Sequence, residues 1–249
     1  MITLITGGSR GLGKNTALTL AERGHDIIIT YNSKKDEAEA VVAEVNKLGR
    51  KAAALQLDVS KSGTFAGFAD SVKKVLSEVF GAERFDNLVN NAGIGINAPF
   101  EETTEEQFDL LVDIHLKAPF FLTQKLLPVI KDGGRIMNIS SGLARFCMPG
   151  YSAYGAMKGG VEVLTRYMAA ELGKRGISVV VLAPGAIETD FGGGVVRDNK
   201  HVNDHIASIT ALGRVGLPDD IGGAVAALLS ADARWINGMR IEASGGMIL

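Results

Sequence analysis

Cysteine is nearly missing from this chain of 249 residues, which contains only Cys147. A single cysteine excludes an internal disulfide, and no cysteine and histidine residues cluster at the spacing of metal ligands. We therefore expect no metal site, and the free thiol suits a reducing compartment, which favours a cytoplasmic location.

An excess of one charge sign and long apolar runs are also missing. The 26 Lys and Arg residues nearly balance the 28 Asp and Glu residues, and no run of five or six like charges occurs. Without a basic stripe, the chain is not expected to bind the backbone of a nucleic acid. No stretch reaches the roughly 18 consecutive apolar residues of a membrane span, so we expect no membrane partner.

Glycine is abundant, with 31 residues, and short β-branched runs alternate with amphipathic stretches. The runs predict strands at 2–6, 26–30, 52–57, 88–90, 135–140, 177–182 and 239–243. The stretches between them predict helices at 12–23, 36–48, 64–79, 105–130, 153–174 and 218–230. This alternation predicts a doubly wound, Rossmann-type α/β fold, in which a parallel sheet of about seven strands has helices on both faces. We expect a single domain that spans residues 1–249.

The stretch GGSRGLGKNT, residues 7–16, follows the first expected strand and has two interpretations. Read from Gly8, it matches a phosphate-binding P-loop, except that Asn15 stands where a Ser or Thr would bind magnesium. Read from Thr6, it is TGxxxGxG, a turn that brings the backbone close to the pyrophosphate of a dinucleotide at a helix N-terminus. Asn15 favours the dinucleotide, and ATP with magnesium is the alternative.

The candidate catalytic residues are Ser141, Tyr154 and Lys158. Tyr154 and Lys158 are four residues apart on one face of an expected helix, and Ser141 follows an expected strand. Reduction of a ketone needs a proton donor beside the carbonyl oxygen while a hydride reaches the carbon. A phenol has a pKa of about 10, and a cation about 4 Å away can lower it by about three units. We therefore expect Lys158 to lower the pKa of Tyr154.

The motifs TGxxxGxG, NNAG, a serine after a strand, YxxxK and PGxxxT occur in this order from Thr6 to the closing GMRIEASGG. Together they resemble the short-chain dehydrogenase/reductase family, in its short single-domain branch of β-ketoacyl-carrier-protein-reductase-like enzymes. The resemblance implies hydride transfer between a nicotinamide cofactor and a carbonyl or secondary alcohol, with Tyr154 as general acid or base. It also implies that Lys158 binds the nicotinamide ribose and that Ser141 donates a hydrogen bond to the substrate oxygen.

One position departs from the family pattern. His115, in VDIHLKAPF, stands where the family usually carries an asparagine that holds a proton-relay water. An imidazole could hold the same water, and it would add a group that titrates near neutral pH. Alternatively, His115 is a packed helix residue and the relay is weakened.

The cofactor is expected to be NADP(H) in preference to NAD(H). No carboxylate stands about twenty positions after the glycine turn, while Arg10, Asn32 and Ser33 can bind a 2′-phosphate. By resemblance, further contacts come from the NNAG and PGxxxT motifs and from the residues after the third strand. The expected cofactor residues are Gly7, Ser9, Arg10, Gly11, Leu12, Gly13, Asn32, Ser33, Asp58, Val59, Asn90, Ala92, Gly93, Tyr154, Lys158, Pro184, Gly185, Ile187 and Thr189.

The substrate is expected to be a small, largely apolar carbonyl or alcohol compound. A triple glycine followed by a weak helical pattern predicts a substrate lid at about 190–215. The expected pocket residues are Ile94, Ile96, Leu143, Phe146, Cys147, Tyr151 and Phe191.

Helices 105–130 and 153–174 carry apolar residues on more than one face, so we expect a homodimer or homotetramer. Two other functions stay open: a non-catalytic nucleotide-sensing protein of the same fold, and an epimerase or dehydratase.

Overall fold

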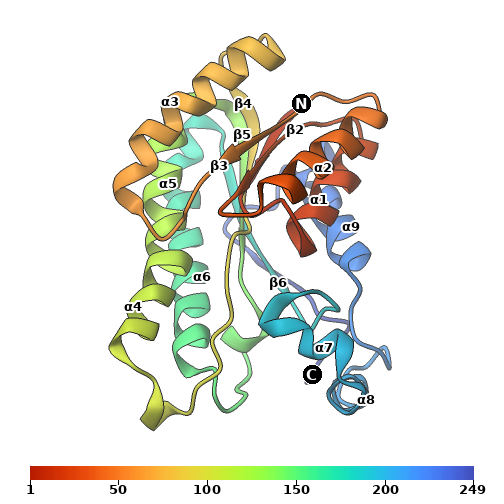
Figure 1. Ribbon diagram of the computed structural model, residues 1–249. Coiled ribbons are helices and arrows are strands. Elements are labelled where there is room, and N and C mark those ends of the chain that lie inside the picture. The colour runs from red at the N-terminus through yellow and green to blue at the C-terminus, as the bar shows by residue number, and fades with distance from the viewer.

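The computed structural model describes residues 1–249, and a seven-stranded sheet forms its centre (Figure 1). The strand order is β3-β2-β1-β4-β5-β6-β7, and all neighbouring strands are parallel. The order reverses between β1 and β4, which is where open α/β sheets bind ligands. The predicted fold class is confirmed.

All seven predicted strands are present. β4 and β5 begin earlier than predicted, because polar residues interrupt the apolar pattern at their beginnings. These polar residues have partners in the sheet: Asp86 accepts hydrogen bonds from the Ile2 N–H and from Lys131. The strands are β1 (Ile2–Ile5), β2 (Asp26–Tyr31), β3 (Ala52–Gln56), β4 (Phe85–Asn90), β5 (Ile130–Ile139), β6 (Ser178–Pro184) and β7 (Arg240–Ala243).

Helices cover both faces of the sheet (Figure 1). On one side lie α3 (Phe65–Val75), α4 (Glu105–Val112), α5 (Ala118–Leu126) and α6 (Ser152–Leu172). On the other side lie α1 (Gly11–Glu22), α2 (Lys35–Lys47) and α9 (Pro218–Leu229). One buried cluster, with Phe65 and Leu122, fills the first layer, and a second, with Ala17 and Val225, fills the other. None of the helices has the length and apolar character to cross a membrane.

The single helix predicted at 105–130 is wrong in detail. It divides into α4, a five-residue π-helical turn (Asp113–Lys117) and α5, and a 3₁₀ turn (Leu127–Val129) follows. Pro119 lacks the N–H that would continue the regular ladder, so the helix widens just before it. The wide turn contains His115, whose side chain is buried.

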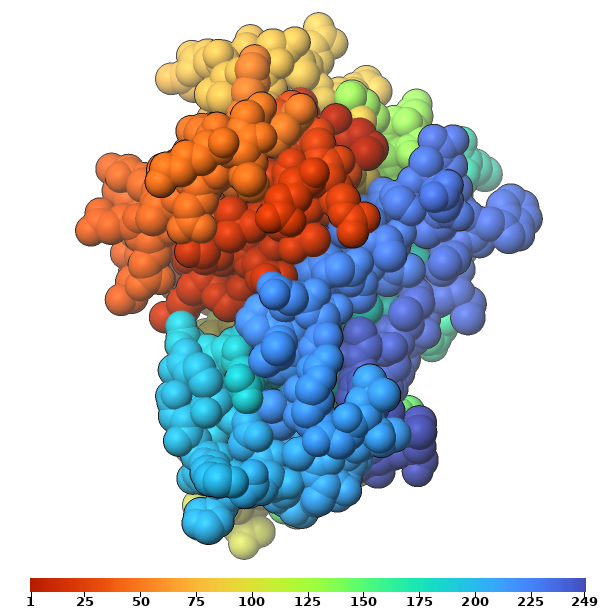
Figure 2. Space-filling model, turned by 90° about the vertical axis from the view of Figure 1, so that its right-hand side faces the viewer, coloured from red at the N-terminus to blue at the C-terminus, as the bar shows by residue number.

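The segment after β6 contains a 3₁₀ turn (Phe191–Gly194), α7 (Val195–Asp198) and α8 (Lys200–Ser208). All three glycines of the turn have positive φ, between 62° and 78°, a conformation that other residues rarely adopt. Figure 2 shows these helices, in cyan and light blue, beneath the N-terminal part of the chain and beside the segment that follows α9. The predicted lid residues therefore border the carboxyl ends of the strands (Figure 1).

Candidate active site

One elongated cavity of about 500 Å³ runs along the carboxyl ends of the strands. The glycine turn before α1 borders one end, together with the residues that follow β2. Ser141, Tyr154 and Lys158 border the other end, with the segment that contains α7 and α8. The cavity therefore joins the two groups of residues that the motifs singled out.

The glycine turn leaves its backbone open to this cavity. Gly7 has a φ of 66°, and a Cβ there would lie 2.9 Å from the Cα of Ala92. Arg10 precedes α1, but no side chain caps the helix and its first turn has no acidic residue. The free N–H groups at a helix N-terminus bind phosphate, so this end fits a dinucleotide pyrophosphate.

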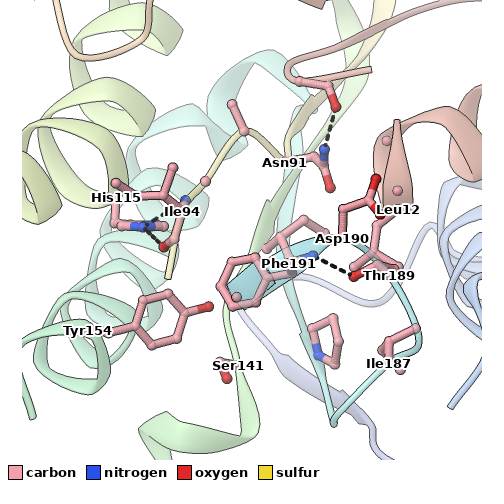
Figure 3. Close-up of a pocket in the computed structure, with 18 of the residues that line it drawn as sticks. Leu12, Asn91, Ile94, His115, Ser141, Tyr154, Ile187, Thr189, Asp190 and Phe191 are labelled. Carbon is pink, nitrogen blue, oxygen red and sulfur yellow. Dashed lines mark hydrogen bonds between the residues drawn. The ribbon is translucent and has the colours of Figure 1, made fainter. Parts of the chain in front are cut away.

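Asn91, which was not among the predicted site residues, fixes the glycine turn. Its Nδ2 donates to the carbonyl oxygens of Thr6 at 2.9 Å and Gly7 at 3.2 Å, and its backbone N–H donates to the Thr6 hydroxyl. Figure 3 shows one hydrogen bond from the Asn91 side chain. Asn90, which was predicted, is buried and donates to Thr123 and Asn138, outside the cavity lining. Successive residues of a strand face opposite sides, so only the register shows which asparagine faces the cavity.

The other predicted cofactor residues line the cavity. Arg10, Asn32 and Ser33 are exposed at the far end, where a 2′-phosphate would lie. Hydrogen bonds from Ser60 hold the pKa of Asp58 below its usual range, so that carboxylate is charged. The lining includes Gly7, Ser9, Arg10, Gly11, Leu12, Gly13, Asn32, Ser33, Asp58, Val59, Ala92, Gly93, Tyr154, Lys158, Pro184, Gly185, Ile187 and Thr189.

Ser141, Tyr154 and Lys158 meet at the end of β5. Tyr154 and Lys158 are only 6% and 5% exposed, and both lie on the face of α6 that packs on the sheet. The Lys158 ammonium donates to the Ile139 carbonyl at 2.8 Å and lies 5.4 Å from the centre of the Tyr154 ring. The Ser141 hydroxyl accepts from the Leu143 N–H at 3.2 Å.

The pKa of Tyr154 is raised, whereas we expected Lys158 to lower it. Burial raises the pKa of Tyr154 above its ordinary value, although the Ser141 hydroxyl offsets part of the rise. Burial also lowers the pKa of Lys158 to about 7. A charge pair about 4 Å apart is worth about 4 kcal/mol with an effective dielectric of 20, and Lys158, with a pKa of about 7, is only partly charged at neutral pH. Full burial can shift a pKa by 3–5 units, roughly 4–7 kcal/mol. Desolvation therefore outweighs the charge attraction.

His115 is a neutral, buried residue that fastens the segment after β4. Its Nε2 lies 2.8 Å from the Ile94 carbonyl oxygen, which can only accept, so the proton is assigned to Nε2 (Figure 3). Nδ1 is buried without a hydrogen-bond partner, and the ring meets Tyr154 edge-on with centroids 5.2 Å apart. Burial, and then the Lys158 charge, lower the pKa of His115 to about 2. Of the two alternatives for His115, the group that titrates near neutral pH is therefore not supported, and the buried side chain agrees with the packed helix residue.

The cavity is mainly apolar and aromatic beyond Tyr154. Phe191 covers this end: its ring lies 5.9 Å from Tyr154, and a Cβ on Gly95 would lie 2.7 Å from its Cε1 (Figure 3). Cys147, predicted in the lining, is instead exposed and outside it. The neighbours of Cys147, which are Phe146 and Met148, line the cavity in its place.

The sequence patterns did not predict several apolar residues that line the cavity. Val202 and Ile206 had a usable signal, since they stand four residues apart on one face of α8. No sequence signal indicated Met247, because no local pattern connects residues 244–249 with this cavity. Ile96, which was predicted, packs outside the lining. The apolar lining at this end is Ile94, Leu143, Phe146, Met148, Tyr151, Phe191, Val195, Val196, Val202, Ile206 and Met247.

Comparisons with known proteins agree with this geometry. The family model described as Enoyl-(Acyl carrier protein) reductase matches residues 7–248. The hydroxynaphthalene reductase-like protein Arp2 of Metarhizium brunneum is 34% identical, over 99% of this chain and 94% of its own length.

Two solved structures are also similar over nearly their full length. The promiscuous reductase LugOII, which catalyses keto-reduction at C1 during lugdunomycin biosynthesis, has a TM-score of 0.94 and 36% identity, with 99% of this chain and 97% of that chain covered. The angucycline C-6 ketoreductase LanV, solved with bound NADP, has a TM-score of 0.94 and 36% identity, with 99% and 95% covered.

Proposed function

The chain belongs to the short-chain dehydrogenase/reductase family, and from this premise we propose that it reduces an uncharged, ring-containing ketone with NADPH. One observation carries the proposal. A single cavity has an uncapped helix N-terminus at one end and Ser141, Tyr154 and Lys158 at the other.

The cofactor end fits NADP(H). The glycine turn and the open end of α1 would bind the pyrophosphate, while Arg10, Asn32 and Ser33 would bind the 2′-phosphate. No acidic residue follows β2 until Asp36, so nothing at this position repels that phosphate. LanV, whose structure holds NADP, supports the same choice. The bound cofactor would supply the hydride.

Tyr154 would act as the acid in the direction of reduction. Its raised pKa keeps the phenol protonated at neutral pH, so a proton is available for the carbonyl oxygen. The Ser141 hydroxyl would donate a hydrogen bond to the same oxygen. Oxidation of an alcohol would start from the phenolate, which burial makes scarce at neutral pH, so the resting protonation state of Tyr154 is the one that reduction needs. Donation would leave the phenolate, which must take up a proton before the next turnover.

The substrate end suits an apolar molecule with rings. Phe146, Tyr151 and Phe191 contribute aromatic surfaces, and Lys158 is the only cationic side chain that lines this end. The names of relatives, which refer to hydroxynaphthalene and angucycline compounds, support a polycyclic substrate. Residues 190–215 would form a lid that closes over it, with the glycines of Phe191–Gly194 as the hinge.

A panel of carbonyl compounds tests this function. NADPH consumption should be fastest with bicyclic aromatic ketones, slower with small aliphatic ketones, and absent with charged keto acids. Tyr154→Phe should remove turnover but preserve NADPH binding, because the phenol acts after binding. A chain that binds NADPH but reduces no carbonyl compound would instead be a nucleotide sensor.

We also propose that the chain forms a homodimer or homotetramer through α4, α5 and α6. These helices expose large apolar side chains away from the sheet: Phe108, Phe120, Phe121, Val163 and Tyr167. Light scattering at micromolar concentration should show more than one chain, and the Phe121→Asp/Tyr167→Asp variant should be a monomer. A monomeric wild type would contradict the proposal.

A further inference from the structure

Four charged side chains form a continuous network beside the substrate end of the cavity. Arg240 on β7 pairs with Glu162 on α6 at 2.7 Å and with Glu242 at 2.6 Å. Arg145, after β5, holds both carboxylate oxygens of Glu242 at 2.9 Å. Burial opposes ionisation of Glu242, but its hydrogen bonds outweigh that effect and hold its pKa at about 2. None of the four side chains lines the cavity.

One end of this network holds the backbone next to the proposed catalytic serine. The hydroxyl of Ser140 donates to Glu162 at 2.7 Å, and its oxygen lies 3.3 Å from the carbonyl oxygen of Lys158. Arg240 also donates to the carbonyl oxygen of Ser141 at 3.4 Å. The network thus links β5, α6 and β7 immediately behind the proposed catalytic residues.

The other end holds the C-terminal tail, which we define as residues 244–249. Arg145 donates to the carbonyl oxygens of Met247 and Ile248, both at 2.8 Å. Ile248 has a φ of 51°, the only positive value outside glycine, and a β-branched residue adopts this conformation only where its surroundings impose it. The tail is therefore fastened by several contacts.

Met247 brings the tail into the cavity wall. Its side chain is 2% exposed, lines the cavity and belongs to a buried cluster with Ile206 and Val215. Phe146, the residue after Arg145, packs against the same cluster. Figure 2 shows the last residues of the chain, in dark blue, beside the segment near residue 210, and the Ile248 N–H donates to Ile209. The same short loop therefore carries both a cavity wall residue and the arginine that holds the tail.

We propose that Met247 sets the size of the substrate that fits, and that Arg145 and Glu242 are positioning residues that lock the tail in place. A bidentate pair between an arginine and a half-buried carboxylate is strong and directional, which suits this role. Arg145 does not line the cavity but contacts two wall residues, Met247 through its carbonyl oxygen and Phe146 through its ring, whose centre lies 5.4 Å away. Its loss should therefore raise KM for a bulky substrate more than it lowers kcat. The assignment of the substrate as a ketone rests on the proposed function, whereas the locking of the tail does not.

Hydrogen exchange tests the lock without any activity measurement. Arg145→Gln should speed exchange of the amides of residues 245–249 by about tenfold or more, with Arg145→Lys intermediate. Arg175→Gln is the matched control, since Arg175 also binds one carboxylate, Asp132, and two backbone carbonyls, but near the beginning of β5, at the opposite end of the strands. Wild-type exchange in the Arg145→Gln tail would overturn the proposal.

Kinetics test the role of Met247. Met247→Trp should lower kcat/KM for a bicyclic ketone at least tenfold relative to a small aliphatic ketone, and Met247→Leu should change this ratio less than twofold. Arg145→Gln should raise KM for the bicyclic ketone about tenfold and lower kcat less than threefold. An unchanged ratio in Met247→Trp would overturn the assignment. If the wild type reduces no ketone, the proposed function fails, while the exchange experiment still decides whether the tail is locked.

Discussion

The two ends of the cavity differ in what forms their walls, which is mainly backbone at one end and side chains at the other. At the cofactor end the wall is mainly backbone: glycines without side chains, the open N–H groups of α1 and the ends of strands in fixed register. At the substrate end the wall consists of side chains from four separate segments, which are the residues after β4 around Ile94, 143–151, 190–208 and the C-terminal tail.

This difference determines what each end tolerates. A backbone wall depends on φ values and close approaches that a single added methyl group disrupts, so changes there should affect cofactor binding as a whole. A side-chain wall can change its shape one residue at a time while Tyr154 and Lys158 stay on α6. Changes there should alter which ketone fits and leave the chemistry intact.

Substitution of Lys158, which lies where the two ends of the cavity meet, should have the largest effect on stability and turnover. The fall of its pKa from 10.5 to about 7 corresponds to about 5 kcal/mol of cost for the buried charge at low pH. Lys158→Met should remove that cost. It should also leave the Ile139 carbonyl without its hydrogen-bond donor, which costs about 1–2 kcal/mol of stability. We expect a gain of about 3 kcal/mol in the free energy of unfolding at pH 7, with turnover reduced by about a thousandfold.

The sign of the pH dependence checks this account. Between pH 7 and about 10, the unfolded chain keeps a proton on Lys158 that the folded chain releases, so wild-type stability should rise with pH in this window. Denaturant unfolding should show the rise in the wild type and in the exposed control Lys125→Met, but not in Lys158→Met. If the stability of Lys158→Met rises with pH in the same way, another titrating group causes the rise.

Gly13→Val tests the backbone wall. A Cβ at Gly13 would collide with the carbonyl oxygen of Gly7 and approach the Asn91 amide to 2.7 Å, so the turn must shift. We expect NADPH to bind about 100-fold more weakly, a loss of about 2.7 kcal/mol. Fluorescence titration measures the affinity for NADPH. The control is Gly67→Val, because a Cβ at Gly67 has open space around it. Retained affinity would mean that the turn is flexible.

Sequence patterns predicted the cofactor end better than the substrate end, and the reason is physical. A glycine turn between a strand and a helix is encoded within a few residues, and so is the spacing from Tyr154 to Lys158. The choice between Asn90 and Asn91, the exposure of Cys147 and the place of Met247 depend on contacts between distant segments. The pKa values of Tyr154 and His115 depend on burial, which local spacing does not reveal.

Arg10→Ala should have a smaller effect that separates the two cofactors. The exposed guanidinium would lose a charge-assisted hydrogen bond to the 2′-phosphate, which only NADPH carries. We expect about thirtyfold weaker NADPH binding, a loss of about 2 kcal/mol, and NADH binding within twofold of wild type. Arg23→Ala, at the other end of α1, is the control. Equal losses for both cofactors would show that Arg10 does not select the phosphate.

His115 should give the smallest effect, because its role is to hold backbone in place. His115→Asn should keep turnover within about threefold, since an amide can also donate to the Ile94 carbonyl. His115→Leu should lower turnover about tenfold, about 1.4 kcal/mol of barrier, because the segment over Tyr154 loses its fastening. Since burial holds the pKa of His115 near 2, the imidazole carries no charge at working pH. The pH profiles of the wild type and His115→Asn should therefore coincide between pH 6 and 8, where Lys158 titrates. An inflection below pH 7 that only the wild type shows would mean that His115 is charged and takes part in proton transfer.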